Sequence, residues 1–154
     1  MSTASRKSQS VRTRKLAPHD YEVLAEFRYL LTRFSAFSEQ AAREAGLAPR
    51  QHRALLAIKG YPGAGAMTIG HLAQRLGIRH HSAGELVTRL VSRGYLTRRE
   101  DSHDRRRVLL CVTLSGEKAL SGLSEAHRRE LGRLAPLLSA LLGRLGPPEN
   151  RDGK

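Results

Sequence analysis

The chain has 154 residues, with 27 Lys and Arg against 14 Asp and Glu, and 40% of its residues are hydrophobic. That apolar fraction excludes wholesale disorder, and the formal net charge of +13 favours a polyanionic partner. A single cysteine excludes a disulfide scaffold. The longest aliphatic run, residues 108–112, is too short to cross a bilayer and no secretory signal is evident, so we expect no membrane partner and a reduced, cytoplasmic location.

The two ends of the chain differ in composition from its middle. Residues 1–17 are rich in Arg, Lys, Ser and Thr and hold no acid, so we predict a flexible basic arm. This arm either follows a phosphate backbone or is a solvated tail. Residues 147–154 contain Pro, Gly and charged residues and are predicted to be a disordered tail. One domain over residues 18–146 remains.

The first predicted helix covers about residues 20–45. It opens near Pro18, with acids in its first turn, and stops at Gly46. Most of the aromatic residues of the chain lie on it and on more than one face, so the helix needs more than one packing partner. A second subunit is a candidate for that partner. Another helix is predicted to begin with Pro49 at its first position.

Two short helices joined by a tight turn come next. Thr68 is a good N-cap for the first, and Gly77 ends it. The second runs to Gly94 and carries an unbroken apolar stripe of Ala83, Leu86, Val87 and Leu90. This pattern is typical of a helix-turn-helix. The opposite face has short polar side chains that suit base edges in a major groove, although an ordinary solvated helix also has a polar face.

A β-hairpin is predicted after this pair of helices. Residues 95–99 form one strand, residues 100–104 the turn and residues 105–112 the returning strand. The tip holds three consecutive arginines, which repel one another unless acids or an anion offset them; Asp101 and Asp104 can hold the base of this wing. An arginine at the end of a ribbon suits the narrow, electronegative minor groove of A·T-rich DNA.

The last predicted helix is capped by Thr113 and becomes rich in leucine toward its end. Pro136 interrupts the pattern, so we expect a kink or a new helix near this residue. The leucine-rich end is too apolar for solvent, and pairing with the helix over residues 20–45 across a two-fold axis would cover both. The predicted fold is therefore mainly α with a small β-hairpin wing, of the α+β class, in a homodimer.

Four stretches of the chain are distinctive as a set. They are Leu72-Ala73-x-x-Leu76-Gly77-Ile78, Leu86-Val87-Thr88-Arg89-Leu90-Val91-Ser92-Arg93-Gly94-Tyr95-Leu96, Asp101-Ser102-His103-Asp104-Arg105-Arg106 and Val112-Thr113-Leu114-Ser115-Gly116. Together they resemble the MarR-type winged helix-turn-helix transcriptional regulators, over about residues 20–145. The resemblance implies dimerisation helices at about 20–45 and 114–145, a DNA-binding region at about 49–112, and two winged helices presented to a pseudo-palindromic operator.

The resemblance and the polar face of the second helix together give the candidate DNA-binding residues. These are Arg79, His80, His81, Ser82, Glu85, Thr88, Arg89, Arg105 and Arg106, with Asp101 and Asp104 supporting the wing. The run Arg79-His80-His81 departs from the family, in which small hydroxyl or mixed polar residues are more usual at these positions. We expect a sequence-specific regulator, in particular a repressor. The alternative is a basic nucleic-acid-binding protein without sequence specificity.

Release of DNA by a small aromatic or lipophilic effector is a further implication of the resemblance. A pocket would then lie where the helix over residues 20–45 meets the winged domain, lined by some of Tyr29, Phe34, Phe37 and His52. The alternative is that all four are core and interface packing. Cys111 lies within a predicted strand and is expected to be a buried, inert thiol rather than a redox sensor.

Other chemistry finds no support in the sequence. The seven histidines include only one adjacent pair, and no His-x-x-x-His pair or second thiol completes a tetrahedral set, so we predict no metal site. Phosphate-binding loops and nucleophile elbows are missing as well. We therefore expect neither a cofactor nor enzyme activity.

Overall fold

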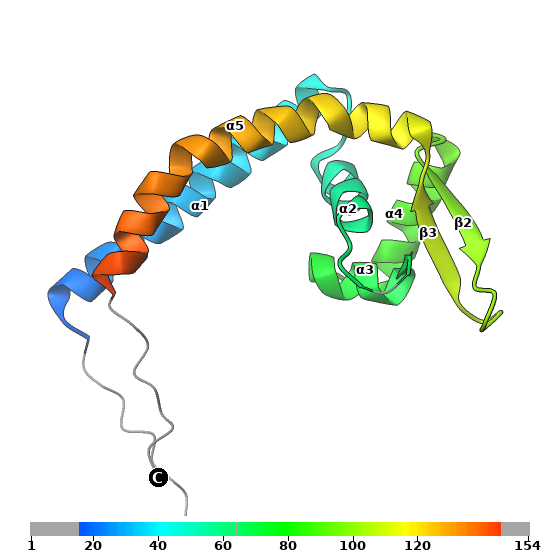
Figure 1. Cartoon of the computed structure of the whole chain (residues 1–154), viewed down its shortest axis with the longest axis horizontal. Helices are drawn as coiled ribbons and strands as arrows, with labels where there is room; N and C mark the ends of the chain where they lie inside the picture. Colours follow the sequence, from blue (N-terminus) through cyan, green and yellow to red (C-terminus); the bar gives the residue numbers. More distant parts are fainter. Residues whose placement is uncertain (1–15, 64, 146–154) are drawn as a thin grey trace, which may run out of the picture.

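A bundle-like arm of two long helices carries a small winged domain at one end (Figure 1). The computed structural model describes residues 16–63 and 65–145. Within these residues the elements are α1 (Pro18–Glu44), α2 (Pro49–Lys59), β1 (Met67–Thr68), α3 (Ile69–Leu76), α4 (His80–Ser92), β2 (Leu96–Glu100), β3 (Val108–Val112) and α5 (Leu114–Arg144). The predicted fold class, mainly α with a β-hairpin wing, is confirmed.

The predicted basic arm and C-terminal tail lie outside the described residues, except for the end of the arm. Leu16 and Ala17 are described, and Ala17 belongs to the start of α1 as its N-cap. The carboxylate of Asp20 accepts a hydrogen bond from the backbone N–H of Ala17 at 2.8 Å. The arm is therefore at least two residues shorter than residues 1–17.

The two long helices pack antiparallel along a narrow apolar seam. Val23 and Leu30 of α1 meet Leu134 and Leu141 of α5, and each pair is separated by seven residues. Such spacing keeps one stripe of each helix facing its partner. The start of α1 and the end of α5 lie together at the far end of the arm from the winged domain (Figure 1). Since the seam is narrow, much of the apolar surface of both helices stays exposed.

The larger core lies inside the winged domain. The predicted stripe of α4 is buried at all four positions, Ala83, Leu86, Val87 and Leu90. It packs with buried residues of the other elements, namely Leu55, Ile58, Met67, Leu72, Leu96, Leu110, Leu120 and Leu123. Burial of such side chains stabilises the fold by roughly 1.5–3 kcal/mol each. This core sets the rotation of α4 and so directs its polar face outward.

The wing contains three strands rather than two. The sheet order is β1-β3-β2, and both pairs are antiparallel. The sequence analysis missed β1, because a strand of two residues is too short to show a period. The returning strand begins at Val108, so the predicted start at residue 105 is wrong: backbone bonds from Asp101 N to Arg107 O (3.0 Å) and from Arg107 N to Asp104 O (2.9 Å) hold residues 105–107 in the turn.

Helix α5 continues through Pro136, so the predicted new helix at this residue is wrong. A proline removes one backbone hydrogen bond and its ring presses on the carbonyl four residues earlier. That residue is Gly132, which has no side chain to hinder a local adjustment. Leu134 and Leu141, on either side of the proline, are both buried against α1 and hold the helix on its course. Figure 1 shows α5 as one curved helix.

The predicted caps of α3 and α5 are confirmed. Thr68 accepts a hydrogen bond from the N–H of His71 at 3.3 Å, and Thr113 accepts one from the N–H of Gly116 at 3.1 Å. Gly77 ends α3 in the left-handed region with φ of 65°, a conformation that glycine adopts without strain. The turn into α4 depends on this residue.

Gly116 gives a test of how tightly α5 packs on the wing. A Cβ at this position would collide with the backbone oxygen of Tyr95, whereas a Cβ at Gly122, in the same helix, meets open space. We expect Gly116→Ala to lower the free energy of unfolding by about 1–3 kcal/mol. Gly122→Ala should raise it by roughly 0.5–1 kcal/mol, because alanine is the better helix former. Urea unfolding measures both; equal effects would contradict the close contact at Gly116.

Candidate nucleic-acid interface

The polar face of α4 is the first part of the candidate interface. His81, Glu85 and Thr88 are exposed and Ser82 is half-buried, on the side opposite the core stripe. A shallow groove of about 440 Å³ runs over this face and is lined by His80, His81, Gly84, Glu85, Thr88 and Arg89. Gly84 contributes no side chain and a Cβ there would meet nothing within 4 Å, so an incoming group can approach the helix backbone. Most of the predicted reading residues thus share one surface.

Contacts between side chains modify what this face can offer. His81 Nε2 lies 3.2 Å from Glu85 Oε1, so a protonated His81 offsets the carboxylate. The hydroxyl of Thr88 donates to the backbone oxygen of Gly84 at 3.0 Å and accepts from Arg98 at 2.7 Å. Thr88 is therefore engaged within the protein, whereas Ser82 and Arg89 present their polar groups at the edge of the face.

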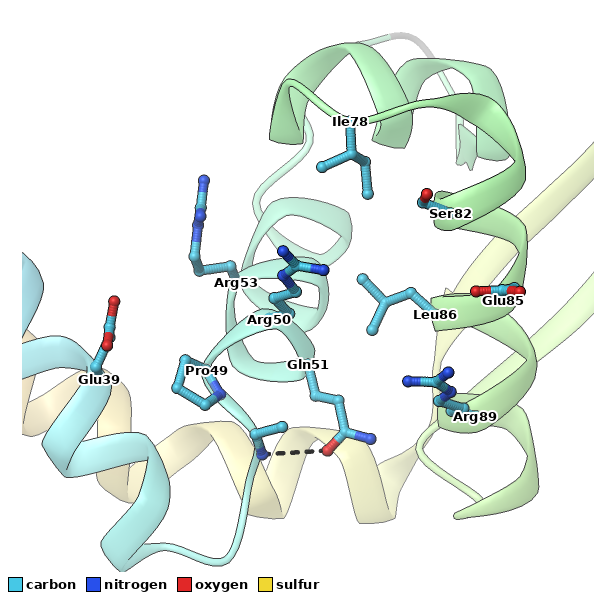
Figure 2. Close-up of a pocket in the computed structure, with 11 residues that line it drawn as sticks. Glu39, Pro49, Arg50, Gln51, Arg53, Ile78, Ser82, Glu85, Leu86 and Arg89 are labelled. Carbon is cyan, nitrogen blue, oxygen red and sulfur yellow. Dashed lines mark hydrogen bonds between the residues drawn. The ribbon is translucent and has the colours of Figure 1, made fainter.

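A cleft of about 660 Å³ lies between α2 and α4 (Figure 2). In the close-up, Ile78 and Leu86 point into the space between the helices, and Arg50 and Arg53 extend from α2. Arg89 borders both this cleft and the groove over α4. The sequence analysis missed the two arginines of α2, because a helix with basic residues looks the same whether it faces solvent or a ligand. Their placement adds positive charge beside the reading face.

Two carboxylates shape the tip of the wing. Asp101 accepts a hydrogen bond from the N–H of His103 at 2.9 Å and lies 3.7 Å from Arg107. The backbone hydrogen bond first, and the nearby positive charge of Arg107 as well, hold the pKa of Asp101 below its ordinary value. Asp104 accepts from the N–H of Arg106 at 3.0 Å. The acids thus fix the main chain of the tip, while the side chains of Arg105 and Arg106 are exposed.

The tip is close to the start of both short helices. A groove of about 520 Å³ is lined by His71 of α3, His80 of α4, and Arg106 and Arg107 of the wing, together with residues 68–70 and Val108. The lining holds no carboxylate. His71 is held from behind by Tyr61, whose hydroxyl is 3.1 Å from His71 Nδ1. His71 was missed by the sequence analysis, because nothing in the spacing links α3 to the wing. The wing and α4 therefore form one continuous cationic surface.

The four residues predicted for an effector pocket do not form one group. Phe34 and Phe37 both contact the ring of His127 edge-on, with centroids 5.7 Å away, and His52 stacks on it at 4.7 Å. Tyr29 stands apart: it is exposed, with the guanidinium of Arg33 5.8 Å from its ring centroid. His127 was not found from sequence, since a single histidine among charged residues carries no pattern.

His52 and His127 form a buried pair where α1, α2 and α5 meet. His127 is fully engaged, with Nδ1 2.6 Å from the backbone oxygen of Leu123 and Nε2 2.7 Å from the hydroxyl of Ser38. His52 is 2% exposed, and both of its ring nitrogens are buried without a hydrogen-bond partner in the described residues. Burial, and then the neighbouring His127, lower the pKa of His52 below 6.5. The neutral form of His52 is thereby favoured.

The remaining expectations concern metal ions, the thiol and membranes. Cys111 is half-buried in β3, opposite Thr97. Among residues 16–63 and 65–145, the structure groups no three or more His, Cys, Asp or Glu side chains that could hold a metal ion. None of the helices in this part of the chain is both long and apolar enough to span a membrane.

Comparison with known proteins gives matches to one family. The MarR family pattern matches residues 45–107, from the end of α1 to the wing. The HTH-type transcriptional regulator YcgE of Bacillus subtilis, itself described as uncharacterized, is 35% identical over 97 residues. That alignment covers 63% of this chain and 61% of YcgE, less than two thirds of its length.

Two solved structures share the fold at low sequence identity. A MarR family protein from Bacillus stearothermophilus superposes with a TM-score of 0.69 at 18% identity, over 85% of this chain and 96% of the other. The S. aureus MepR F27L mutant bound to an oligodeoxyribonucleotide superposes with a TM-score of 0.60, also at 18% identity, over 85% and 99%. The likeness covers the long helices as well as the winged domain.

The buried His52 predicts a pH dependence of stability. Because its pKa is lower in the folded chain than in the unfolded one, the unfolded chain binds more protons as the solution becomes acidic. Stability from the neutral ring is complete above pH 6.5 and decreases as the pH falls below it. We expect the free energy of unfolding, measured in urea between pH 7.5 and 5.5, to fall less in His52→Phe than in the wild type. His103→Gln, at the exposed wing tip, should keep the wild-type slope; an unchanged slope in His52→Phe would contradict the assignment.

Proposed function

We propose that this chain, a MarR-type winged helix-turn-helix protein, binds double-stranded DNA as a homodimer and represses transcription from a pseudo-palindromic operator. The observation that carries the proposal is the continuous cationic surface formed by α4, the start of α3 and the wing tip. Figure 1 shows this side of the winged domain turned away from α5. Exposed cations on a helix and a ribbon match the shape and charge of adjacent DNA grooves.

Sequence reading is assigned to the exposed face of α4. His81, Ser82, Glu85 and Arg89 would enter the major groove, where amide, hydroxyl and guanidinium groups distinguish base edges. Glu85 is tolerated near phosphates because His81 lies 3.2 Å from it, and a carboxylate can also accept from a cytosine amino group. Arg105 or Arg106 would enter the minor groove, while Arg79, His80 and the arginines of α2 approach phosphates.

The homodimer is proposed from the apolar surface that the arm leaves uncovered. Large apolar residues of α1 and α5 are exposed, among them Tyr21, Leu24, Tyr29, Leu31, Leu131, Leu137, Leu142 and Leu145. A surface of this kind on a small chain needs a partner, and a second copy related by a two-fold axis covers the same patch on both chains. Two recognition helices would then enter successive major grooves about 10 bp apart.

A small aromatic or lipophilic effector is proposed at the junction of α1, α2 and α5. The support is the set of Phe34, Phe37 and His52 around His127, in which His52 keeps two buried nitrogens without partners. Packing alone is the competing explanation. A thermal-shift screen of aromatic acids and lipophilic compounds distinguishes the two, since a ligand that binds only the folded chain raises its melting temperature.

Arg106 tests the contact of the wing with DNA. Arg106→Ala should weaken binding to the DNA upstream of this gene by about 1–3 kcal/mol, and most strongly where the flanking sequence is A·T-rich. Arg129→Ala, an exposed position on α5, is the matched control and should bind as the wild type does. Fluorescence anisotropy at physiological salt measures both. Normal binding by Arg106→Ala contradicts the wing contact, and equal affinity of the wild type for random DNA contradicts the regulator.

The dimer is tested separately in the absence of DNA. Sedimentation equilibrium at micromolar concentration should give twice the chain mass of 17.0 kDa. Leu142→Glu places a charge on the exposed apolar surface of the arm and should shift the equilibrium toward monomer or unfolded chain. Leu114→Glu is the control, because Leu114 is 78% exposed at the base of the wing, away from the arm. A well-folded wild-type monomer would refute the dimer.

A further inference from the structure

The geometry points to Arg98 as a further DNA-contacting residue, one that holds a backbone phosphate at the edge of the major groove. Thr88, predicted from sequence to read bases, would instead position the Arg98 guanidinium. This inference rests on the proposed function, since it places a residue outside the recognition helix and the wing tip in the same DNA interface. Three observations carry it.

The first observation is the face of β2 on which Arg98 lies. Successive side chains of a strand point to opposite faces, so Arg98 shares the face of Leu96, which is buried in the core. Arg98 also pairs in register with the buried Leu110 of β3. It therefore continues the inner face of the wing just beyond the edge of the core, beside α4. Arg99, the next residue, is on the other face and pairs with Leu109.

The second observation is the hydrogen bond between the wing and the recognition helix. Arg98 Nη2 donates to Thr88 Oγ1 at 2.7 Å, across two elements that are separate in the fold. The proton of the same hydroxyl goes to the backbone oxygen of Gly84 at 3.0 Å. Thr88 thus has no proton left for a base acceptor, and its oxygen serves the guanidinium. The bond fixes a long, flexible side chain at the border of the exposed face of α4.

The third observation is charge. A guanidinium has five N–H donors, and the bond to Thr88 uses one of them. Within residues 16–63 and 65–145, Arg107 has Asp101 and His81 has Glu85, but Arg98 has no carboxylate within ion-pair distance. A cation held in place by a neutral oxygen keeps its full charge for an anion. Because it stands at the side of α4 rather than at the centre of the reading face, the anion within its reach is a phosphate beside the groove.

The test compares two neighbouring arginines on opposite faces of β2. Arg98→Ala should weaken duplex binding about tenfold, the loss expected for one charge-assisted hydrogen bond, and alike for the operator and a scrambled duplex. It should also reduce the slope of log affinity against log salt by about one, as for the loss of one phosphate contact. Arg99→Ala is the matched control and should bind as the wild type does. Urea unfolding confirms that each variant is folded.

The role of Thr88 is tested by a double-mutant cycle. Thr88→Val keeps the shape of the side chain and removes the hydroxyl, so it should weaken binding in the wild-type background and have little further effect in Arg98→Ala. Ser92→Ala, which removes the next hydroxyl of α4, should change neither affinity nor slope. Arg98→Lys should restore part of the salt slope, because the positive charge is kept.

Each contrary result has a separate meaning. Wild-type affinity in Arg98→Ala, an equal loss in Arg99→Ala, or additive effects of Thr88→Val and Arg98→Ala would overturn the inference while the proposed function stands. A loss confined to the operator with an unchanged salt slope would make Arg98 a base reader and would also overturn it. If the wild-type chain binds no duplex at all, the proposed function itself fails.

Discussion

Burial of one apolar stripe on α4 is the constraint on which the rest of this structure depends. Leu86, Val87 and Leu90 face the core, and this orientation alone sends the opposite, polar face of the helix to solvent. The core also anchors the first residue of β2, Leu96, so that the wing leaves the domain beside α4 rather than behind it. The arginines of the tip, the histidines at the helix starts and the guanidinium of Arg98 share one surface because all are attached to elements packed on the same core.

Periodic and local features of this fold were open to prediction from sequence. The stripe of α4 is complete over four residues, and the caps at Thr68 and Thr113 act within one turn, so their chemistry is visible in a short window. Features that join distant segments were not. The contact of His52 with His127 depends on how α2 meets α5, and the pairing that places Arg98 against Thr88 depends on the register of β2. A proline inside a helix has an outcome set by its packing, which the sequence around it does not state.

The candidate site divides in the same way. The residues of α4 and the tip arginines follow from a helix face and a hairpin turn, and the structure places them on one surface. Arg50, Arg53 and His71 lie at this surface only because α2 and α3 pack beside α4, and basic residues on an amphipathic helix give no sign of what they face. Thr88 shows the reverse case: its position on the helix is as expected, but its hydroxyl is occupied by a neighbour that no periodicity reveals.

Helix α5 links the two ends of the molecule without a joint. It begins directly after the wing, where Thr113 bonds to the backbone oxygens of Gly94 and Tyr95, and it ends in the seam with α1. At 1.5 Å per residue its 31 residues span about 46 Å. A helix of this length is a lever: tilting it by about 5° at the seam moves the wing by roughly 4 Å, close to one base-pair step of 3.4 Å. Small changes in the arm are therefore converted directly into a change in which groove positions the winged domain can reach.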